Sequence, residues 1–267
     1  TFVKSSSLTK CMTMPNNTNR PVETVERAID IIEYLKQNES APASEITEHL
    51  GCAKSTAHRH LKTLEANSFL IEKEDEYRLG LRFLDYGTVA RDRYTLYREA
   101  KPKVDSLAAE TEEKIWCAVE EHGRSIHIYG AQGKRSVQTY AHVGHRNYLH
   151  QHAAGKAILA NLPDETIEEV IDRYGLPART PNTITDRDDL WEEIESIRDR
   201  GYAFNLEESV EGLHALGAPI TDQNDDAIGA ISISGPATRL EGSLLRDQLP
   251  GLLLGTVNEI TINLAHV

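Results

Sequence analysis

Fewer than sixty residues near the N-terminus carry three helical patterns followed by two strand patterns, and this order constrains the fold most. The first helix presents apolar side chains at helical spacing on one stripe, and Thr24 is placed to cap it. The stripe consists of Val25, Ala28, Ile29, Ile32 and Leu35. A second, short helix has Ile46 and Leu50 one turn apart, and Gly51 ends it.

The third helix completes a compact arrangement with the strands that follow it. Ser55 is placed to cap this helix, and its inward positions are Ala57, Leu61 and Leu64. Two short strands at residues 69–73 and 77–79 then flank an acidic turn. Three helices and a hairpin predict a small closed module over residues 23–80, preceded by a disordered polar tail at residues 1–22.

The rest of the chain reads differently. One helix is predicted over residues 81–98 as a linker, and after Pro102 another runs to about residue 113. Strand-like alternation occurs at residues 115–119, 126–128 and 227–235, and helical patterns at 155–161, 164–174, 186–200 and 251–265. Without a regular βαβ rhythm, this mixture predicts an α+β domain around an antiparallel sheet over residues 99–267.

The charge of the chain is uneven. Its formal net charge is −13, yet no acid occurs from residue 53 to residue 64. A helix with one apolar face and one short cationic face suits the major groove of DNA. The predicted DNA contacts are Ser44, Lys54, Ser55, Thr56, His58, Arg59 and Lys62. The alternative is a surface helix whose basic face contacts only solvent. The adjacent pair of strands and the absence of acidic residues from 53 to 64 favour a helix that binds DNA.

Composition excludes several classes of protein. No stretch approaches the roughly 18 apolar residues of a membrane-spanning helix. The three cysteines, Cys11, Cys52 and Cys117, indicate no disulfide framework and no CxxC metal site. We therefore expect a cytoplasmic protein without a membrane partner. The excess of acids is typical of proteins adapted to high internal salt, although an ordinary acidic protein is the alternative.

Several segments together resemble one family, the IclR-type transcription regulators. VERAIDIIEYL, SEITEHLGCAKSTAHRHLKTLE and YRLGLRFLDYG are similar to its winged helix-turn-helix and linker start. HQHAAGKAILANLP, RDRGYAFNLEESVEGLHALGAPITD and IGAISISGP are similar to three blocks of its effector domain. The resemblance implies an N-terminal module that binds a double-stranded DNA operator, a dimerising linker helix and a C-terminal GAF-like domain for a small-molecule effector. It implies a homodimer or homotetramer that is not an enzyme and needs no cofactor.

The resemblance also implies where the effector binds. The effector positions are Ala153, Ala154, Gly155, Asn205, Leu213, Ala215, Ser232 and Ser234. Physical reasoning supports part of this set, because Ser232 and Ser234 share one face of a strand and backbone N–H groups at a helix start can hold a carboxylate. Asn205 and Ala215 differ from members that bind short keto acids, which carry an acid and a cysteine there.

At two places in the DNA-binding module the chain differs from the pattern of the family that it resembles. Many relatives have glycine near position 68, where this chain has Ser68, so Asn67 is expected to take the left-handed conformation instead. The wing turn at residues 72–76 is rich in acids. Because acids repel phosphate, we expect this wing to contribute little to DNA binding.

A cluster of histidines supports a rival hypothesis. His142, His145, His150 and His152 lie close together in the sequence. They could hold zinc in a metal-sensing regulator, or in a hydrolase with Glu207 or Glu208 as general base. Their spacing matches no metalloprotease helix motif, and scattered histidines are more often ordinary surface or pocket groups. The regulator therefore remains the main hypothesis.

Overall fold

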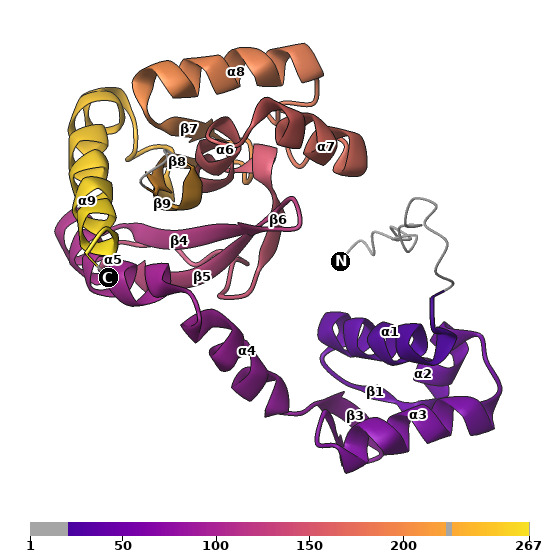
Figure 1. Ribbon diagram of the computed structural model, residues 1–267. Helices are drawn as coiled ribbons and strands as arrows, with labels where there is room; N and C mark the ends of the chain where they lie inside the picture. The colour runs from indigo at the N-terminus through magenta and orange to yellow at the C-terminus, as the bar shows by residue number, and fades with distance from the viewer. Residues whose placement is uncertain (1–20, 223–225, 267) are drawn as a thin grey trace. The chain divides into compact units, whose positions relative to one another are not determined.

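The computed structural model describes residues 21–222 and 226–266. The chain divides into two compact units, of which the first ends at Tyr86 and the second begins at Gly87 (Figure 1). The division falls inside the linker predicted at residues 81–98. The predicted tail, residues 1–22, lies outside the described residues except for its last two positions.

The first unit is the expected set of three helices and a hairpin, with one further strand. Its elements are α1 (Glu23–Asn38), β1 (Ala41–Pro42), α2 (Ala43–Leu50), α3 (Lys54–Ala66), β2 (Leu70–Lys73) and β3 (Glu76–Leu79). The strands form a sheet in the order β1-β3-β2. The core consists of Ile31, Leu35, Ala41, Ile46, Leu61, Leu70 and Tyr77. Gly51 ends α2 in the left-handed conformation, as predicted.

The predicted stripe on α1 is only partly right. Leu35 is buried, but Val25 and Ile29 are 54% and 52% exposed, whereas the unpredicted Ile31 is fully buried. The apolar side chains of α1 cover a wider face than the one that packs against α2, α3 and the sheet. Val25 and Ile29, at the edge of that face, therefore stay in solvent. Thr24 does not cap α1, because Val22 occupies the cap position.

Local backbone geometry corrects two further predictions. Ser55 lies in the first turn of α3, and Ala53 is the cap residue. Ser68 itself takes the left-handed conformation with φ 61°, whereas Asn67 has φ −95°. The Asn67 side chain instead donates a hydrogen bond to the carbonyl of Thr63 at 2.8 Å, so it satisfies the end of α3 without a left-handed backbone.

The linker is two helices rather than one. The chain forms α4 (Arg82–Asp92), breaks, and continues as α5 (Thr95–Thr111). No residue of α4 is buried, whereas α5 buries one face that includes Leu96 and Val104. The break therefore separates an unpacked helix from one that packs on a sheet. Pro102, expected to mark a boundary, lies inside α5.

The second unit has the predicted α+β architecture. A six-stranded antiparallel sheet has the order β6-β5-β4-β9-β8-β7. Its strands are β4 (Lys114–Glu121), β5 (Arg124–Gln132), β6 (Arg146–Tyr148), β7 (Ala203–Leu206), β8 (Leu213–Thr221) and β9 (Ala227–Pro236). The remaining helices are α6 (Ala153–Ala160), α7 (Asp164–Tyr174), α8 (Arg187–Arg200) and α9 (Leu249–Leu264), with short helical turns at Leu149–Gln151 and Leu244–Gln248. The sequence patterns located the helices and three strands but missed β6, β7 and β8.

Both faces of this sheet are covered. Ile115 and Ile231 pack with α5 and α9 in one hydrophobic cluster. Ala118 and Ala230, on the opposite face, pack with α6, α7 and α8 (Figure 1). Toward one end of this second face, Trp116 pairs in register with Ser232, and small side chains leave space next to the start of α6.

Candidate functional site

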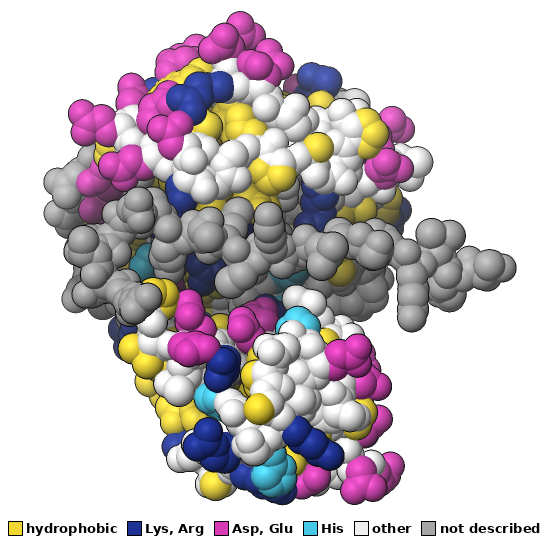
Figure 2. Space-filling model, turned by 90° about the vertical axis from the view of Figure 1, so that its right-hand side faces the viewer, with side chains coloured by type: hydrophobic (Ala, Val, Ile, Leu, Met, Phe, Trp, Pro, Cys, Tyr) yellow, Lys and Arg dark blue, Asp and Glu magenta, His cyan; other side chains and the backbone are white. Residues whose placement is uncertain are grey.

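The cationic face of α3 is exposed as the sequence predicts. Ala57 and Leu61 are fully buried beneath it. Ser44 in α2 and, on α3, Lys54, Ser55, His58, Arg59 and Lys62 are not buried, and Thr56 is half-buried. Figure 2 shows Lys, Arg and His side chains gathered on the lower lobe, which is the first unit, with acidic side chains beside them. A hollow at the start of α3 is lined by Ala43, Thr47, Lys54, Ser55 and His58.

Lys62 differs from the other cations of this face. Its Nζ donates hydrogen bonds to Glu65 at 2.8 Å and to Glu72 of β2 at 2.7 Å. These hydrogen bonds, first from Glu65 and then from Glu72, raise the pKa of Lys62 above its usual range. The salt bridges within 4.0 Å in the described part of the chain include Lys62 but neither Lys54 nor Arg59. On this face of α3, Lys54 and Arg59 therefore keep their charges unpaired by any salt bridge of the described residues.

The second candidate site is a cavity between the sheet and the start of α6. The empty space there is about 590 Å³ when the open space at its mouth is included. Five predicted effector residues line it, namely Ala153, Leu213, Ala215, Ser232 and Ser234. Sequence reasoning missed several other lining residues, among them Trp116, His127, Tyr140, Gln151, His152 and Arg179.

Three predicted effector residues lie behind the wall of this cavity. Ala154 is fully buried among the side chains of α6 and α8. A Cβ on Gly155 would come within 2.3 Å of the carbonyl oxygen of Leu149, so this glycine allows a close backbone approach. Asn205 donates a hydrogen bond to the carbonyl of Gln151 at 2.8 Å and accepts one from Ser209 at 3.2 Å. Its role here is to hold two lining residues in place.

An aromatic stack forms one wall. The rings of Trp116 and His127 are nearly parallel, with centroids 4.4 Å apart. Lys114 Nζ lies 4.2 Å from the Trp116 ring centre, at a cation–π distance. A Cβ at position 130 would be 2.4 Å from the Trp116 ring, so only Gly130 lets the indole lie across β5. This wall is thus a flat aromatic surface, and contacts with His127, Lys114 and Gly130 hold the Trp116 ring in place.

Among the described residues, the lining of the cavity carries a positive charge and no negative one. Among its described lining residues, Arg179 is the one with a permanent charge, and its guanidinium lies 4.2 Å over the ring of Tyr140. Burial lowers the pKa of His152 to about 3, and the positive charge of Arg179 adds to that shift. Burial likewise lowers the pKa of His127 well below its usual range. Both imidazoles are therefore neutral at pH 7.

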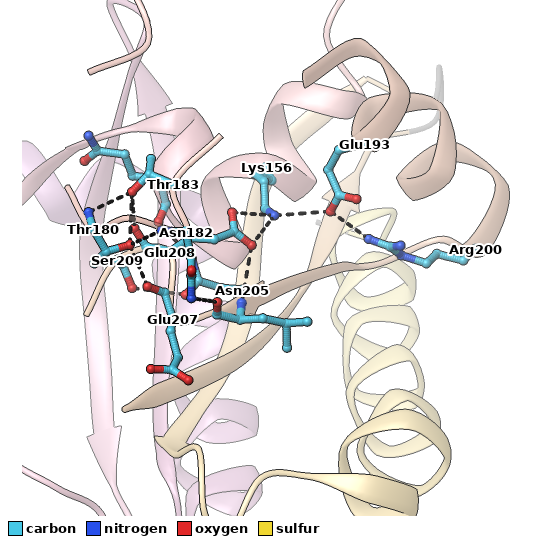
Figure 3. A network of polar contacts seen from close by, with 12 residues as sticks. Lys156, Thr180, Asn182, Thr183, Glu193, Arg200, Asn205, Glu207, Glu208 and Ser209 are labelled. Atoms are coloured by element: carbon cyan, nitrogen blue, oxygen red, sulfur yellow. Dashed lines mark hydrogen bonds and ion pairs between the residues drawn. The ribbon is translucent and has the colours of Figure 1, made fainter. Parts of the chain in front are cut away.

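A polar network supports the loops that border the cavity (Figure 3). Lys156 of α6, 1% exposed, places its Nζ 2.8 Å from a carboxylate oxygen of Glu208 and 3.2 Å from Glu193 of α8. Thr183 donates a hydrogen bond to the carbonyl of Glu208 at 2.6 Å, which ties the loop after α7 to the β7–β8 loop. Burial raises the pKa of the Glu208 carboxyl, and Lys156 opposes this shift.

The histidine cluster does not assemble into a metal site. His150 lies 3.2 Å from the carbonyl of Pro177, and His142 lies 2.8 Å from the carbonyl of Val143. Within residues 21–222 and 226–266, no three His, Cys, Asp or Glu side chains are placed to hold a metal ion. The zinc hypothesis therefore has no site in this part of the chain.

A helix-turn-helix module joined to a domain with an open cavity defines a one-component transcription regulator. The family model for the IclR helix-turn-helix domain matches residues 24–72, and that for the bacterial transcriptional regulator IclR C-terminal domain matches residues 89–262. The chain therefore belongs to the IclR family of transcriptional regulators, which are not enzymes. None of the described helices is long and apolar enough to cross a membrane.

Individual relatives agree with this assignment. The chain is 33% identical to a probable HTH-type transcriptional regulator, ArcR, of Halobacterium salinarum, over 93% of this chain and 96% of that protein. This relative supports the interpretation of the acidic composition as halophile-type. The IclR structure from Thermotoga maritima matches with a TM-score of 0.76 at 28% identity, covering 91% of this chain and 98% of that one. An IclR homologue from Microbacterium hydrocarbonoxydans complexed with 4-hydroxybenzoate has a TM-score of 0.77 at 22% identity, covering 91% and 100%.

Proposed function

We propose that this regulator binds a specific DNA operator through α3 and that a small carboxylic acid in the cavity controls the binding. The observation that carries the choice of ligand is the charge of the cavity, where Arg179 has no acidic neighbour among the described lining residues. An anion gains from such a cation and from the hydroxyls of Ser232 and Ser234. The structural neighbour complexed with 4-hydroxybenzoate makes this acid a suitable first test ligand.

On the DNA side, we assign two kinds of contact to the exposed face of α3. Lys54 and Ser55, at the helix start, suit phosphate, because the N-terminus of a helix favours anions. Thr56, His58 and Arg59 follow on the outward face and suit base edges. Footprinting on the DNA upstream of its own gene, with and without 4-hydroxybenzoate, tests both halves of the proposal. Absence of a footprint contradicts operator binding. A footprint that neither 4-hydroxybenzoate nor another small carboxylic acid alters contradicts the assigned class of effector.

We propose a homodimer, or a tetramer of two dimers, formed through α4. This helix has no buried residue, yet Leu81 just before it and Leu84 and Val89 within it are 85%, 67% and 68% exposed. Exposed apolar side chains of this size are typical of an interface. Light scattering on the purified chain should give a mass of two or four subunits, and a monomer at micromolar concentration contradicts the assignment. We place the regulator in the cytoplasm, where its DNA is.

Ser234→Val is expected to weaken the effector response about tenfold, which corresponds to about 1.4 kcal/mol, the size of one hydrogen bond. Valine removes the hydroxyl, which now donates to the carbonyl of Lys114 at 3.3 Å and faces the cavity, and puts two methyl groups in its place. The measurement is the ligand concentration that releases half of the operator. Ser243→Val, at an exposed serine without a capping hydrogen bond, is the matched control. An unchanged response in Ser234→Val removes this serine from the site.

Operator affinity is expected to depend weakly on salt. Residues 21–90 carry eight basic and thirteen acidic side chains, a net charge of −5, and Lys62 is already paired. Affinity falls with log salt at a slope of about −0.9 per phosphate neutralised, so few available cations give a shallow slope. Salt also screens the repulsion between the acids and DNA, since the Debye length is about 3 Å at 1 M. The measurement is a titration of affinity from about 0.1 to 2 M KCl, across weak to near-complete screening. Binding lost well below 1 M contradicts the prediction.

A further inference from the structure

The outward face of α3 carries a carboxylate that comes from a different element. Along β2, Leu70 and Glu72 point to the same side of the sheet, because alternate side chains of a strand share a face. Leu70 is buried in the core with Leu61 of α3, whereas Glu72 is exposed and its carboxylate contacts Lys62. Glu65 contacts the same ammonium from less than one turn further along α3. Folding thus brings two acids to one cation on the face that is proposed to bind DNA.

Lys62, Glu65 and Glu72 form a compact charged cluster. Lys62 Nζ lies 2.8 Å from a carboxylate oxygen of Glu65 and 2.7 Å from one of Glu72. The hydrogen bond from Lys62 holds the pKa of the Glu72 carboxyl below its usual range, and the nearby His58 acts in the same direction. One cation between two carboxylates leaves this charged cluster with a net charge of −1.

Lys62 belongs to the same helix face as the residues assigned to DNA. It lies three residues after Arg59 and seven after Ser55, and these spacings place the side chains one and two turns apart on one face. A lysine at such a place contacts a phosphate and releases the counterions that the DNA had bound. Here Glu65 and Glu72 already occupy the position of that phosphate. A phosphate therefore competes with two carboxylates that are attached to the protein.

We propose that Glu65 and Glu72 act as a built-in counterion that withholds Lys62 from DNA and so limits the sequence-independent part of operator binding. The proposal rests on the proposed binding of DNA through α3 and adds the control of one phosphate contact in each subunit. Phosphate contacts carry no sequence information. The charged cluster therefore lowers the affinity for every duplex and leaves the preference for the operator unchanged.

The test is a titration of duplex affinity against KCl with the full chain, followed by fluorescence anisotropy. Combining Glu65→Gln with Glu72→Gln keeps the size of both side chains and removes both charges. This double variant should bind operator and scrambled duplexes more tightly than the wild type does, by the same factor for each. Its plot of log affinity against log salt should be steeper by about 0.9 for each subunit, the effect of one additional phosphate contact.

Two controls separate the release of Lys62 from a general loss of negative charge. Glu45→Gln combined with Glu48→Gln removes two exposed acids of α2 in the same module, neither of which has a salt-bridge partner within 4.0 Å among the described residues. This control should change the slope by much less. In a Lys62→Ala background, Glu65→Gln with Glu72→Gln should likewise give only the small change of the control. Thermal unfolding checks that each variant is folded.

Three results overturn the proposal. The first is a slope in the Glu65→Gln, Glu72→Gln variant that is no steeper than in the α2 control. The second is an equal gain in affinity with and without Lys62, and the third is a gain for the operator that scrambled DNA does not share. Failure of the proposed function is a separate observation, because it appears as a wild-type chain that binds operator and scrambled duplexes equally.

Discussion

Arg59→Ala is expected to abolish specific operator binding. Arg59 lies on the exposed face of α3 above the buried Ala57 and Leu61, and no salt bridge in the described residues engages it. One good base contact contributes about 1–3 kcal/mol of discrimination, and the proposed dimer loses it at both half-sites. Affinity for the operator should therefore fall by roughly a factor of 30 to 25,000, toward the level of unrelated DNA. Fluorescence anisotropy with operator and scrambled duplexes measures both values.

Two other cations provide the comparison. Arg27→Ala removes an arginine from α1 that is ion-paired with Glu23, so operator affinity should change little. Lys62→Ala should have a smaller effect than Arg59→Ala, because Lys62 already pairs with Glu65 and Glu72. If Arg59→Ala keeps its preference for the operator over scrambled DNA, another residue reads the bases.

The DNA module was predictable because its signals are local. The burial of Ala57 and Leu61 and the left-handed Gly51 follow from spacing and residue type within one helix or turn. Lys62 shows the limit of such reasoning. Its partner Glu72 comes from a strand that meets α3 only after folding. From the sequence alone, Lys62 would be counted among the cations available to DNA, whereas the structure shows it in an ion pair.

The lining of the cavity was predictable in part, from a resemblance and from one strand pattern. Ser232 and Ser234 follow from alternation along one strand. Trp116, His127 and Arg179 come from three distant segments and meet only through the pairing of β4 with β5 and the packing of the loop after α7. Strand pairing of this kind depends on register between segments, which no single pattern encodes.

Lys156→Met is expected to destabilise the second unit by about 3–5 kcal/mol, the cost of removing one partner from a buried ion pair. The Lys156 side chain is 2% exposed, and its ammonium faces Glu208 at 2.8 Å and Glu193 at 3.2 Å. Methionine fills most of the space but leaves Glu208 buried without its cation. Thermal and denaturant unfolding measure the loss, which corresponds to a fall in Tm of roughly 6–20 °C for a unit of this size.

The controls separate charge from volume. Lys103→Met removes the exposed ion pair with Glu259 and should cost about 0–1 kcal/mol. Adding Glu208→Gln to Lys156→Met should restore much of the stability, because no buried carboxylate then lacks a partner. A loss in Lys156→Met no larger than that in Lys103→Met contradicts the assignment.

The pH dependence of Lys156→Met gives an independent check. Burial already raises the pKa of Glu208, and without Lys156 only the hydrogen bond from the Leu206 N–H still opposes the shift. An acid whose pKa is higher in the folded than in the unfolded state binds more protons when folded, so stability falls as the pH rises from the unfolded pKa to the folded pKa. The defect in Lys156→Met should therefore be large at pH 7 and shrink as the pH falls toward the ordinary pKa of a glutamate, about 4.3. The double variant that combines Lys156→Met with Glu208→Gln should lack this trend, because an amide does not titrate.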